Sequence, residues 1–175
     1  MLLSSRTLYD HSFNVCFMSL VLGRSLGLAV ERRRSLGRGA LLHDLGMMRA
    51  PAEIRDSVGE LSPEELAQVR KHPTWGRQTL SMTPNFPYDA LNIVLDHHER
   101  ADGTGCPNGL SKKNIPYMAR IVKVVDTYDA MTSPRPHRPA LSTTQAASPL
   151  LERSGSDLDR EMTIEFLRLP SQAIR

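Results

Sequence analysis

The chain has 175 residues, of which 40% are hydrophobic and 23% are charged. This length suits one domain around one hydrophobic core, here residues 1–175, and the apolar content excludes a disordered chain. The formal net charge of +3 comes from scattered basic residues, so the sequence has no basic stripe of the kind that binds duplex nucleic acid.

The cysteines and the longest apolar run indicate the cellular compartment. Cys16 lies in an apolar stretch and Cys106 in a stretch rich in Gly and Pro, which does not indicate a disulfide framework. The apolar run 15–23 is too short to cross a bilayer, and the N-terminus lacks the pattern of a signal peptide. We expect a cytoplasmic protein without membrane insertion.

The N-terminal part shows helical periodicity. Apolar residues that recur every three or four positions predict helices over about 9–26 and 30–45. The second of these carries His43 and Asp44 in its last turn. The stretch 46–59, which follows, is predicted to be a loop.

A start signal for another helix comes next. Ser62 is followed by a proline and, three residues on, by Glu65, which is the pattern of a capping box. The helix runs to about Lys71, and we expect His72 to end it because it precedes a proline. A short helix is expected over 75–80.

The second half of the chain alternates helices with a long loop. Helices are predicted over 88–98, 117–131 and 161–169, and Ser142 can cap one more. The stretch 99–116 is rich in Gly, Pro and Asn, and a loop of this length inside a compact domain is often functional. No strand alternation is present, so the predicted fold class is all-α.

Five histidines lie at or near the ends of predicted helices. Asp126 lies inside an otherwise apolar helix, where a carboxylate is costly unless it is paired or binds a metal. Imidazole and carboxylate donors suit divalent Fe, Mn, Zn, Co or Ni, and two such ions can drive phosphoester hydrolysis by an activated water. The aspartate next to a histidine could bridge the two ions. The candidate ligands are His11, His43, Asp44, His72, His97, His98 and Asp126.

Each of these residues also has a purely structural interpretation. A histidine at a helix end interacts favourably with the helix dipole, and a pair of adjacent histidines can be a cap and a surface residue. His11 can pair with Asp10, and Asp126 can accept a hydrogen bond from a neighbouring helix. Alone, each structural interpretation is the better one; it is the joint pattern that favours a metal site.

Longer motifs occur in a fixed order along the chain. They are LLHDLG at 41–46, KHP at 71–73, DHHERADGTGCP at 96–107, NGL at 108–110, IPYMARIVKVVDTYDAMTSPRP at 115–136 and SGSDLD at 154–159. With these motifs the chain resembles the HD-GYP family, a branch of the HD superfamily of metal-dependent phosphohydrolases. The joint spacing makes the resemblance specific, whereas an HD dipeptide alone is weak.

The resemblance implies an HD-domain bundle of about five to seven helices that hydrolyses cyclic di-GMP to pGpG, GMP or both. It implies two or three divalent transition metals, with Fe or Mn first and Ni, Co or Zn as alternatives. By position, His43 and Asp44 are the HD pair, with a catalytic role as well as a ligand role. The early histidine, the three downstream histidines and the closing aspartate supply the other ligands, which are His11, His72, His97, His98 and Asp126.

The chain departs from the family pattern at several positions. Members with three metals carry a glutamate where this chain has Thr7, so we expect two metals. Met47 stands where a lysine is common, and it cannot make that lysine's phosphate contact. Cys106 replaces the tyrosine of the GYP motif, which removes an aromatic surface, and His137 replaces a usual aromatic residue.

Candidate substrate-binding residues lie near these motifs. Arg135 suits a phosphate, although a solvated loop charge is an equal alternative. For Lys123, a place on the helix surface is the better interpretation. The loop contributes Asp102, Gly103 and Gly105, of which the glycines can preserve the loop geometry.

Two further functions stay open from sequence. One is a signalling module that binds a cyclic dinucleotide or a GGDEF-type partner without turnover, motivated by Met47 and Cys106. The other is an HD phosphohydrolase for another nucleotide, because the fold and the metal site do not determine the base.

Overall fold

The computed structural model describes residues 5–55, 57, 59–134 and 139–170, with the backbone alone for residues 5–7. The helices are α1 (Ser5–Ser25), α2 (Val30–Leu41), η1 (Leu45–Arg49), α3 (Ala52–Arg55), α4 (Pro63–Val69), α5 (His72–Ser81), α6 (Tyr88–Asp96), η2 (Lys112–Asn114), α7 (Tyr117–Thr132), α8 (Thr143–Glu152) and α9 (Arg160–Arg168). No strand occurs in these ranges, so the predicted all-α class is confirmed.

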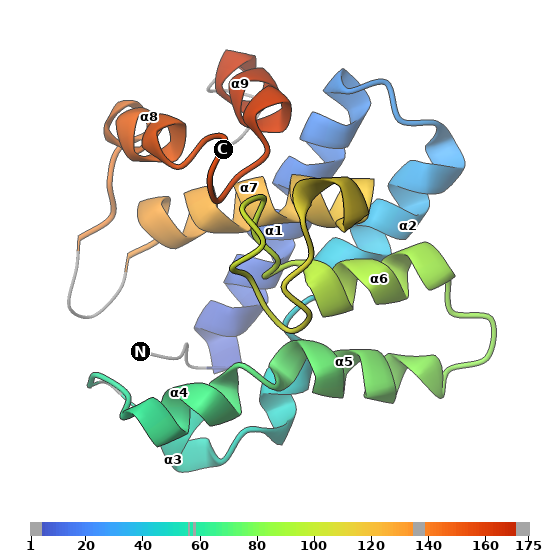
Figure 1. Ribbon diagram of the computed structural model, residues 1–175, viewed down its shortest axis with the longest axis vertical. Helices are drawn as coiled ribbons and strands as arrows, with labels where there is room; N and C mark the ends of the chain where they lie inside the picture. The colour runs from blue at the N-terminus through green and yellow to red at the C-terminus, as the bar shows by residue number, and fades with distance from the viewer. Residues whose placement is uncertain (1–4, 56, 58, 135–138, 171–175) are drawn as a thin grey trace.

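Helix α7 is the centre of the fold. Ile121, Val122, Val124 and Val125 are all fully buried, and a helix that is apolar around most of its circumference must be enclosed by other elements. Helices α1, α6, α8 and α9 pack against it. Figure 1 shows α7 crossing the middle of the molecule, with α8 and α9 above it and α1 behind it.

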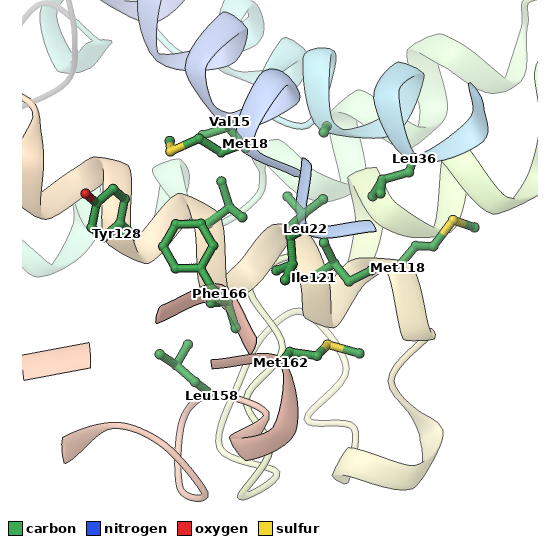
Figure 2. Packing of buried hydrophobic residues seen from close by; sticks show 14 of the residues in the cluster. Val15, Met18, Leu22, Leu36, Met118, Ile121, Tyr128, Leu158, Met162 and Phe166 are labelled. Atoms are coloured by element: carbon green, nitrogen blue, oxygen red, sulfur yellow. The ribbon is translucent and has the colours of Figure 1, made fainter. Parts of the chain in front are cut away.

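The main core fills the space between α7 and the helices around it. Leu22 from α1, Leu36 from α2 and Phe166 from α9 are completely buried. The ring of Phe166 meets that of Tyr128 from α7 edge to face, with 4.9 Å between the ring centroids (Figure 2). This geometry is favourable for aromatic pairs, and it fixes α9 against the central helix.

A second, smaller core holds α5 and α6 together. It contains Leu80, Leu91 and Val94. The backbone of η1 also lies directly against that of α5, because a Cβ added at Gly46 would overlap the carbonyl oxygen of His72. The contact therefore requires glycine, and it brings the residues before Gly46 close to the start of α5.

The predicted caps form. The side chains of Ser62 and Ser142 each accept a hydrogen bond from the backbone N–H three residues on. The glutamate or glutamine side chain there accepts one from the backbone N–H of the serine, so both α4 and α8 begin with capping boxes. None of the helices in the described part of the chain combines the length and apolar character needed to span a membrane.

Some predicted boundaries are wrong. The second helix ends at Leu41, so His43 and Asp44 lie in the turn after it. The stretch 46–59, predicted as a loop, contains most of η1 and all of α3. His72 does not end a helix but is the first residue of α5, because proline is well tolerated in the first turn of a helix.

Candidate metal centre

The seven residues predicted as metal ligands lie together at one place in the fold. They come from α1, the turn after α2, the start of α5, the end of α6 and the middle of α7. They form two groups, within each of which the donor atoms lie within 4.8 Å of one another. The groups are Asp44 with His72, His97 and His98, and His11 with His43 and Asp126.

Asp44 lies between the two groups and presents one oxygen to each. Its Oδ1 is 3.0 Å from Nε2 of His72 and 3.6 Å from Nε2 of His97. Its Oδ2 is 3.6 Å from Nε2 of His43 and 3.8 Å from Nε2 of His11. This is the arrangement expected of a carboxylate that bridges two cations.

Helix ends orient three of the histidines. In each, Nδ1 lies next to the backbone carbonyl oxygen three residues earlier, at 2.7 Å for His43, 2.7 Å for His72 and 2.9 Å for His97. Carbonyls in the last turn of a helix lack partners within the helix, so the rings occupy positions that local structure provides. A carbonyl only accepts, so in the neutral form of each ring Nδ1 carries the proton and Nε2 keeps its lone pair.

His11 is oriented by a side chain instead. Its Nδ1 is 2.7 Å from Oδ2 of Asp129, and its Nε2 is 3.3 Å from Oδ1 of Asp126. Asp129 in turn accepts hydrogen bonds from Asn14 at 3.1 Å and from Ser133 at 3.1 Å. Sequence reasoning missed Asp129, and the available signal was its spacing of three residues from Asp126 on the same helix.

The donor set fits divalent metals. Nε2 of His43 is 3.3 Å from Nε2 of His11, and Nε2 of His72 is 3.3 Å from Nε2 of His97. Facing lone pairs repel unless a proton or a metal ion lies between them. Metal–nitrogen bonds of about 2.1 Å place neighbouring ligand atoms about 3.0–3.4 Å apart in tetrahedral or octahedral sites, which matches these separations.

Protonation in the metal-free protein follows from the close packing of these groups. Burial lowers the pKa of His11, but hydrogen bonds to Asp126 and Asp129, together with the charges of Asp126 and Asp44, outweigh it and raise the pKa to about 10. Burial would raise the pKa of Asp44, yet the neighbouring histidines hold that pKa well below its usual value. Burial and the neighbouring imidazoles lower the pKa of His97 to about 4, so it is neutral near pH 7.

The loop after α6 is held by Glu99. This buried carboxylate accepts hydrogen bonds from the backbone N–H of Asn108 at 2.7 Å and of Leu110 at 2.9 Å. A Cβ added at Gly105 would overlap the Glu99–Arg100 backbone, so the loop folds back closely on itself there. Glu99 is a second residue whose role sequence reasoning missed.

The predicted substrate-binding residues are spread more widely. Gly105 lines a cavity beside His72 and His98. Gly103 has a positive φ of 80°, which glycine adopts without strain, and the Asp102 carboxylate accepts hydrogen bonds from Arg100 and Thr104. Asp102 is therefore already paired within the loop.

Lys123 is more buried than the helix-surface position that the sequence favoured for it. Its side chain is 14% exposed and its Nζ lies 3.8 Å from Oδ1 of the buried Asp157. Arg100 and Arg153 also pair with Asp157, so this aspartate ties the loop and α7 to the segment before α9. Arg135 lies outside the described residues.

The structure describes the side chains at two of the positions at which the chain departs from the family pattern. Met47 is 4% exposed, so its side chain packs in the interior. Cys106 is a free, half-buried thiol on the wall of the cavity, and burial raises its pKa. His137 and the side chain of Thr7 lie outside the described part of the structure.

The chain is similar in sequence to known proteins. A family model described as HD domain matches residues 2–162. A cyclic di-GMP phosphodiesterase of Pseudomonas aeruginosa is 37% identical over 147 residues, which cover 84% of this chain and 36% of that protein. A 3′3′-cGAMP-specific phosphodiesterase of Vibrio cholerae is 34% identical over 139 residues, which cover 79% of this chain and 32% of that protein.

The fold is also similar to that of a solved structure. An HDG"Y"P protein from Bdellovibrio bacteriovorus matches with a TM-score of 0.77 and 26% identity, over 95% of this chain and 53% of that one. The chain spans about a third of the length of the two curated relatives. From the family model, the paired His and Asp clusters and this structural match, we conclude that the chain belongs to the HD domain family, in its HD-GYP branch.

Proposed function

We propose that the chain is a metal-dependent phosphodiesterase that hydrolyses cyclic di-GMP to pGpG, GMP or both. The observation that carries the proposal is the placement of Asp44, whose two oxygens face two separate groups of histidines. The name of the relative from Pseudomonas aeruginosa supports the substrate. We further propose that residues 1–175 act as a single domain.

The side chains are suited to hold two divalent transition ions, with Fe or Mn first and Ni, Co or Zn as alternatives. Such ions would supply a nucleophilic hydroxide and stabilise the charge on the phosphate. Asp44 and Asp126 are ionised and offset part of the cationic charge, because neighbouring histidines keep both pKa values low despite burial. We propose His43 and Asp44 as the central pair.

The cavity is lined by His72 and His98, two of the proposed metal ligands, and we propose that it receives the nucleotide. We also propose that Arg135, Lys123, Asp102, Gly103 and Gly105 contact or shape the path of the substrate. Of these residues, Lys123 and Asp102 are already paired with charged neighbours, so Gly105 has the strongest structural support.

The experiment is to purify the protein without chelators, measure its metal content and follow cyclic di-GMP cleavage by chromatography. We expect two equivalents of transition metal per chain and a linear product. Asp44→Asn should lose both metal and turnover, because one of its two oxygens becomes an amide nitrogen that donates and does not coordinate. Asp89→Asn changes an exposed carboxylate at the start of α6 and serves as the matched control.

Several outcomes would contradict the proposal. Asp44→Asn protein that keeps two metals and full activity would exclude the bridging role. Metal-loaded wild-type protein that binds cyclic di-GMP without cleaving it would exclude the phosphodiesterase and leave a nucleotide-binding or GGDEF-binding signalling module. The observation that favours this alternative is the buried Met47, which cannot make the phosphate contact of a lysine.

A second candidate substrate is 3′3′-cGAMP, because a similar relative from Vibrio cholerae is named as specific for it. Both dinucleotides carry guanine and the same type of phosphodiester, so the metal centre does not distinguish them. Comparing kcat/KM for the two substrates decides between them, and cleavage of a different nucleotide instead would support the broader HD phosphohydrolase.

A further inference from the structure

A cavity of about 510 Å³ opens beside the metal centre, and its walls differ in character. His72 and His98 form the side that belongs to the metal-ligand groups. Leu66 and Val69 from the end of α4 form an apolar wall, and the loop contributes Cys106. The volume is in the range of small-molecule binding sites.

The contents of the cavity follow from its position. In the proposed reaction the scissile phosphate lies at the metal-ligand groups, and it is joined through ribose to a base on each side. Each nucleoside therefore lies next to the metal-ligand groups, and this cavity adjoins them. The apolar wall of Leu66 and Val69 suits the flat face of a base rather than a second phosphate.

Arg70 stands on the same wall and is held in place relative to the metal centre. Its backbone N–H donates to the carbonyl oxygen of Leu66 at 3.0 Å. The carbonyl oxygen of the neighbouring Val69 accepts a hydrogen bond from Nδ1 of His72 at 2.7 Å. The position from which the Arg70 side chain extends is thus fixed to a ligand of the proposed site.

The two arginines on the cavity wall differ in their pairing. Arg100 is bound by both oxygens of Asp102 and lies 3.6 Å from Asp157, so its charge is compensated. Within the described ranges, Arg70 has no ion-pair or hydrogen-bond partner for its guanidinium. Arg70 is therefore a cavity-lining cation with its donors available for a ligand.

We propose that Arg70 contacts the substrate and determines base preference by donating to the O6 and N7 edge of a guanine in this cavity. The proposal rests on the proposed function. A guanidinium only donates hydrogen bonds. Guanine presents two acceptors on this edge, whereas adenine presents one acceptor and one donor, so Arg70 favours guanine over adenine.

The experiment compares wild type with Arg70→Gln, Arg70→Lys and Lys71→Gln. Lys71→Gln is the matched control, because it removes the neighbouring exposed charge, which does not line the cavity. The kinetic constants kcat and KM are measured on metal-loaded protein for cyclic di-GMP and cyclic di-AMP. Binding of GMP and AMP is measured by calorimetry on the same proteins.

Arg70→Gln should lower kcat/KM for cyclic di-GMP roughly tenfold or more, mainly through KM, and should reduce the preference over cyclic di-AMP by a similar factor. Arg70→Lys should recover little of that preference, because an ammonium lacks the planar fork. Lys71→Gln should stay within about twofold of wild type, as expected for an exposed charge.

The outcomes separate this inference from the proposed function. An equal loss of kcat/KM for both dinucleotides in Arg70→Gln would show a phosphate contact and overturn the role in base preference. An unchanged kcat/KM for both would show that Arg70 does not contact the substrate. In another outcome, wild-type protein cleaves neither dinucleotide yet binds GMP better than AMP, and that difference is lost in Arg70→Gln. This result would contradict the phosphodiesterase activity and support the role of Arg70 in base preference. Equal binding of GMP and AMP by wild type overturns the inference.

Discussion

Replacing Asp129 with asparagine tests how the group of His11, His43 and Asp126 is built. The carboxylate of Asp129 accepts from Nδ1 of His11 at 2.7 Å, which directs Nε2 of His11 toward Asp126. Carboxylates behind metal-bound histidines fix the ring and raise its basicity, and losing one typically weakens metal binding 10–100-fold, or about 1.4–2.7 kcal/mol. We expect an effect of this size on one of the two metals.

The effect should be selective because Asp129 contacts only one of the groups. His72 and His97 take their orientation from backbone carbonyls, which the Asp129→Asn substitution leaves intact. Competitive titration of the metal-loaded protein with a chelator should therefore show one weakened and one unchanged equivalent. Ser133→Ala is the control, because it removes a hydrogen bond to Asp129 without touching His11.

Two results would refute this reasoning. If Asp129→Asn protein holds both equivalents as tightly as wild type, the carboxylate does not position His11 for a metal. If both equivalents weaken equally while the melting temperature falls, Asp129 acts through the general stability of the packing between α1 and α7. Ser133→Ala should lose less than about threefold in affinity, since it deletes only one neutral-donor hydrogen bond.

Three further substitutions have expected outcomes. Gly46→Ala should lower the melting temperature and the metal content together, because its Cβ would overlap the carbonyl of His72. Met47→Lys should destabilise the protein in chemical denaturation rather than raise turnover, since it buries an ammonium in place of an apolar side chain that is 4% exposed. Burial raises the pKa of Asp159, but hydrogen bonds from Arg120 and from a backbone N–H at the start of α9 lower it below 3.8 overall. The ionised carboxylate therefore stabilises the fold above that pH, and this contribution is lost as the pH falls. Asp159→Asn should make the decrease in unfolding free energy below about pH 4 less steep.

Local signals in the sequence predicted the helices well where short-range chemistry decides the structure. The capping boxes at Ser62 and Ser142 depend on residues three positions apart, and both helices begin where predicted. The predicted helix end near His43 was wrong because tertiary contacts set it, whereas His72 begins α5 because a proline is well tolerated in the first turn of a helix. The η1 backbone packs on α5 at Gly46, which no local pattern reveals.

The candidate site was predicted as a set of residues but not as a geometry. The seven residues do come together, yet the partner that orients His11 is Asp129, 118 residues away in the chain. Spacing within one helix hints at Asp129, but only the crossing of α1 and α7 brings the two side chains into contact. Arg70 was missed for a similar reason, since its proposed role depends on its place on the cavity wall and on the absence of a partner among the residues that the structure describes.

The position of the histidines at helix ends explains how the site can form before any metal binds. Each of His43, His72 and His97 satisfies a carbonyl that the helix leaves unpaired, so the folded chain selects the Nδ1–H tautomer for structural reasons. The consequence is a cluster of Nε2 lone pairs turned toward one another, which must share a cation. In the metal-free protein that cation is a proton, as the pKa of about 10 for His11 indicates, and metal binding must displace it. The same hydrogen bonds that stabilise the helix ends therefore make the centre both preorganised for metals and dependent on pH for its affinity.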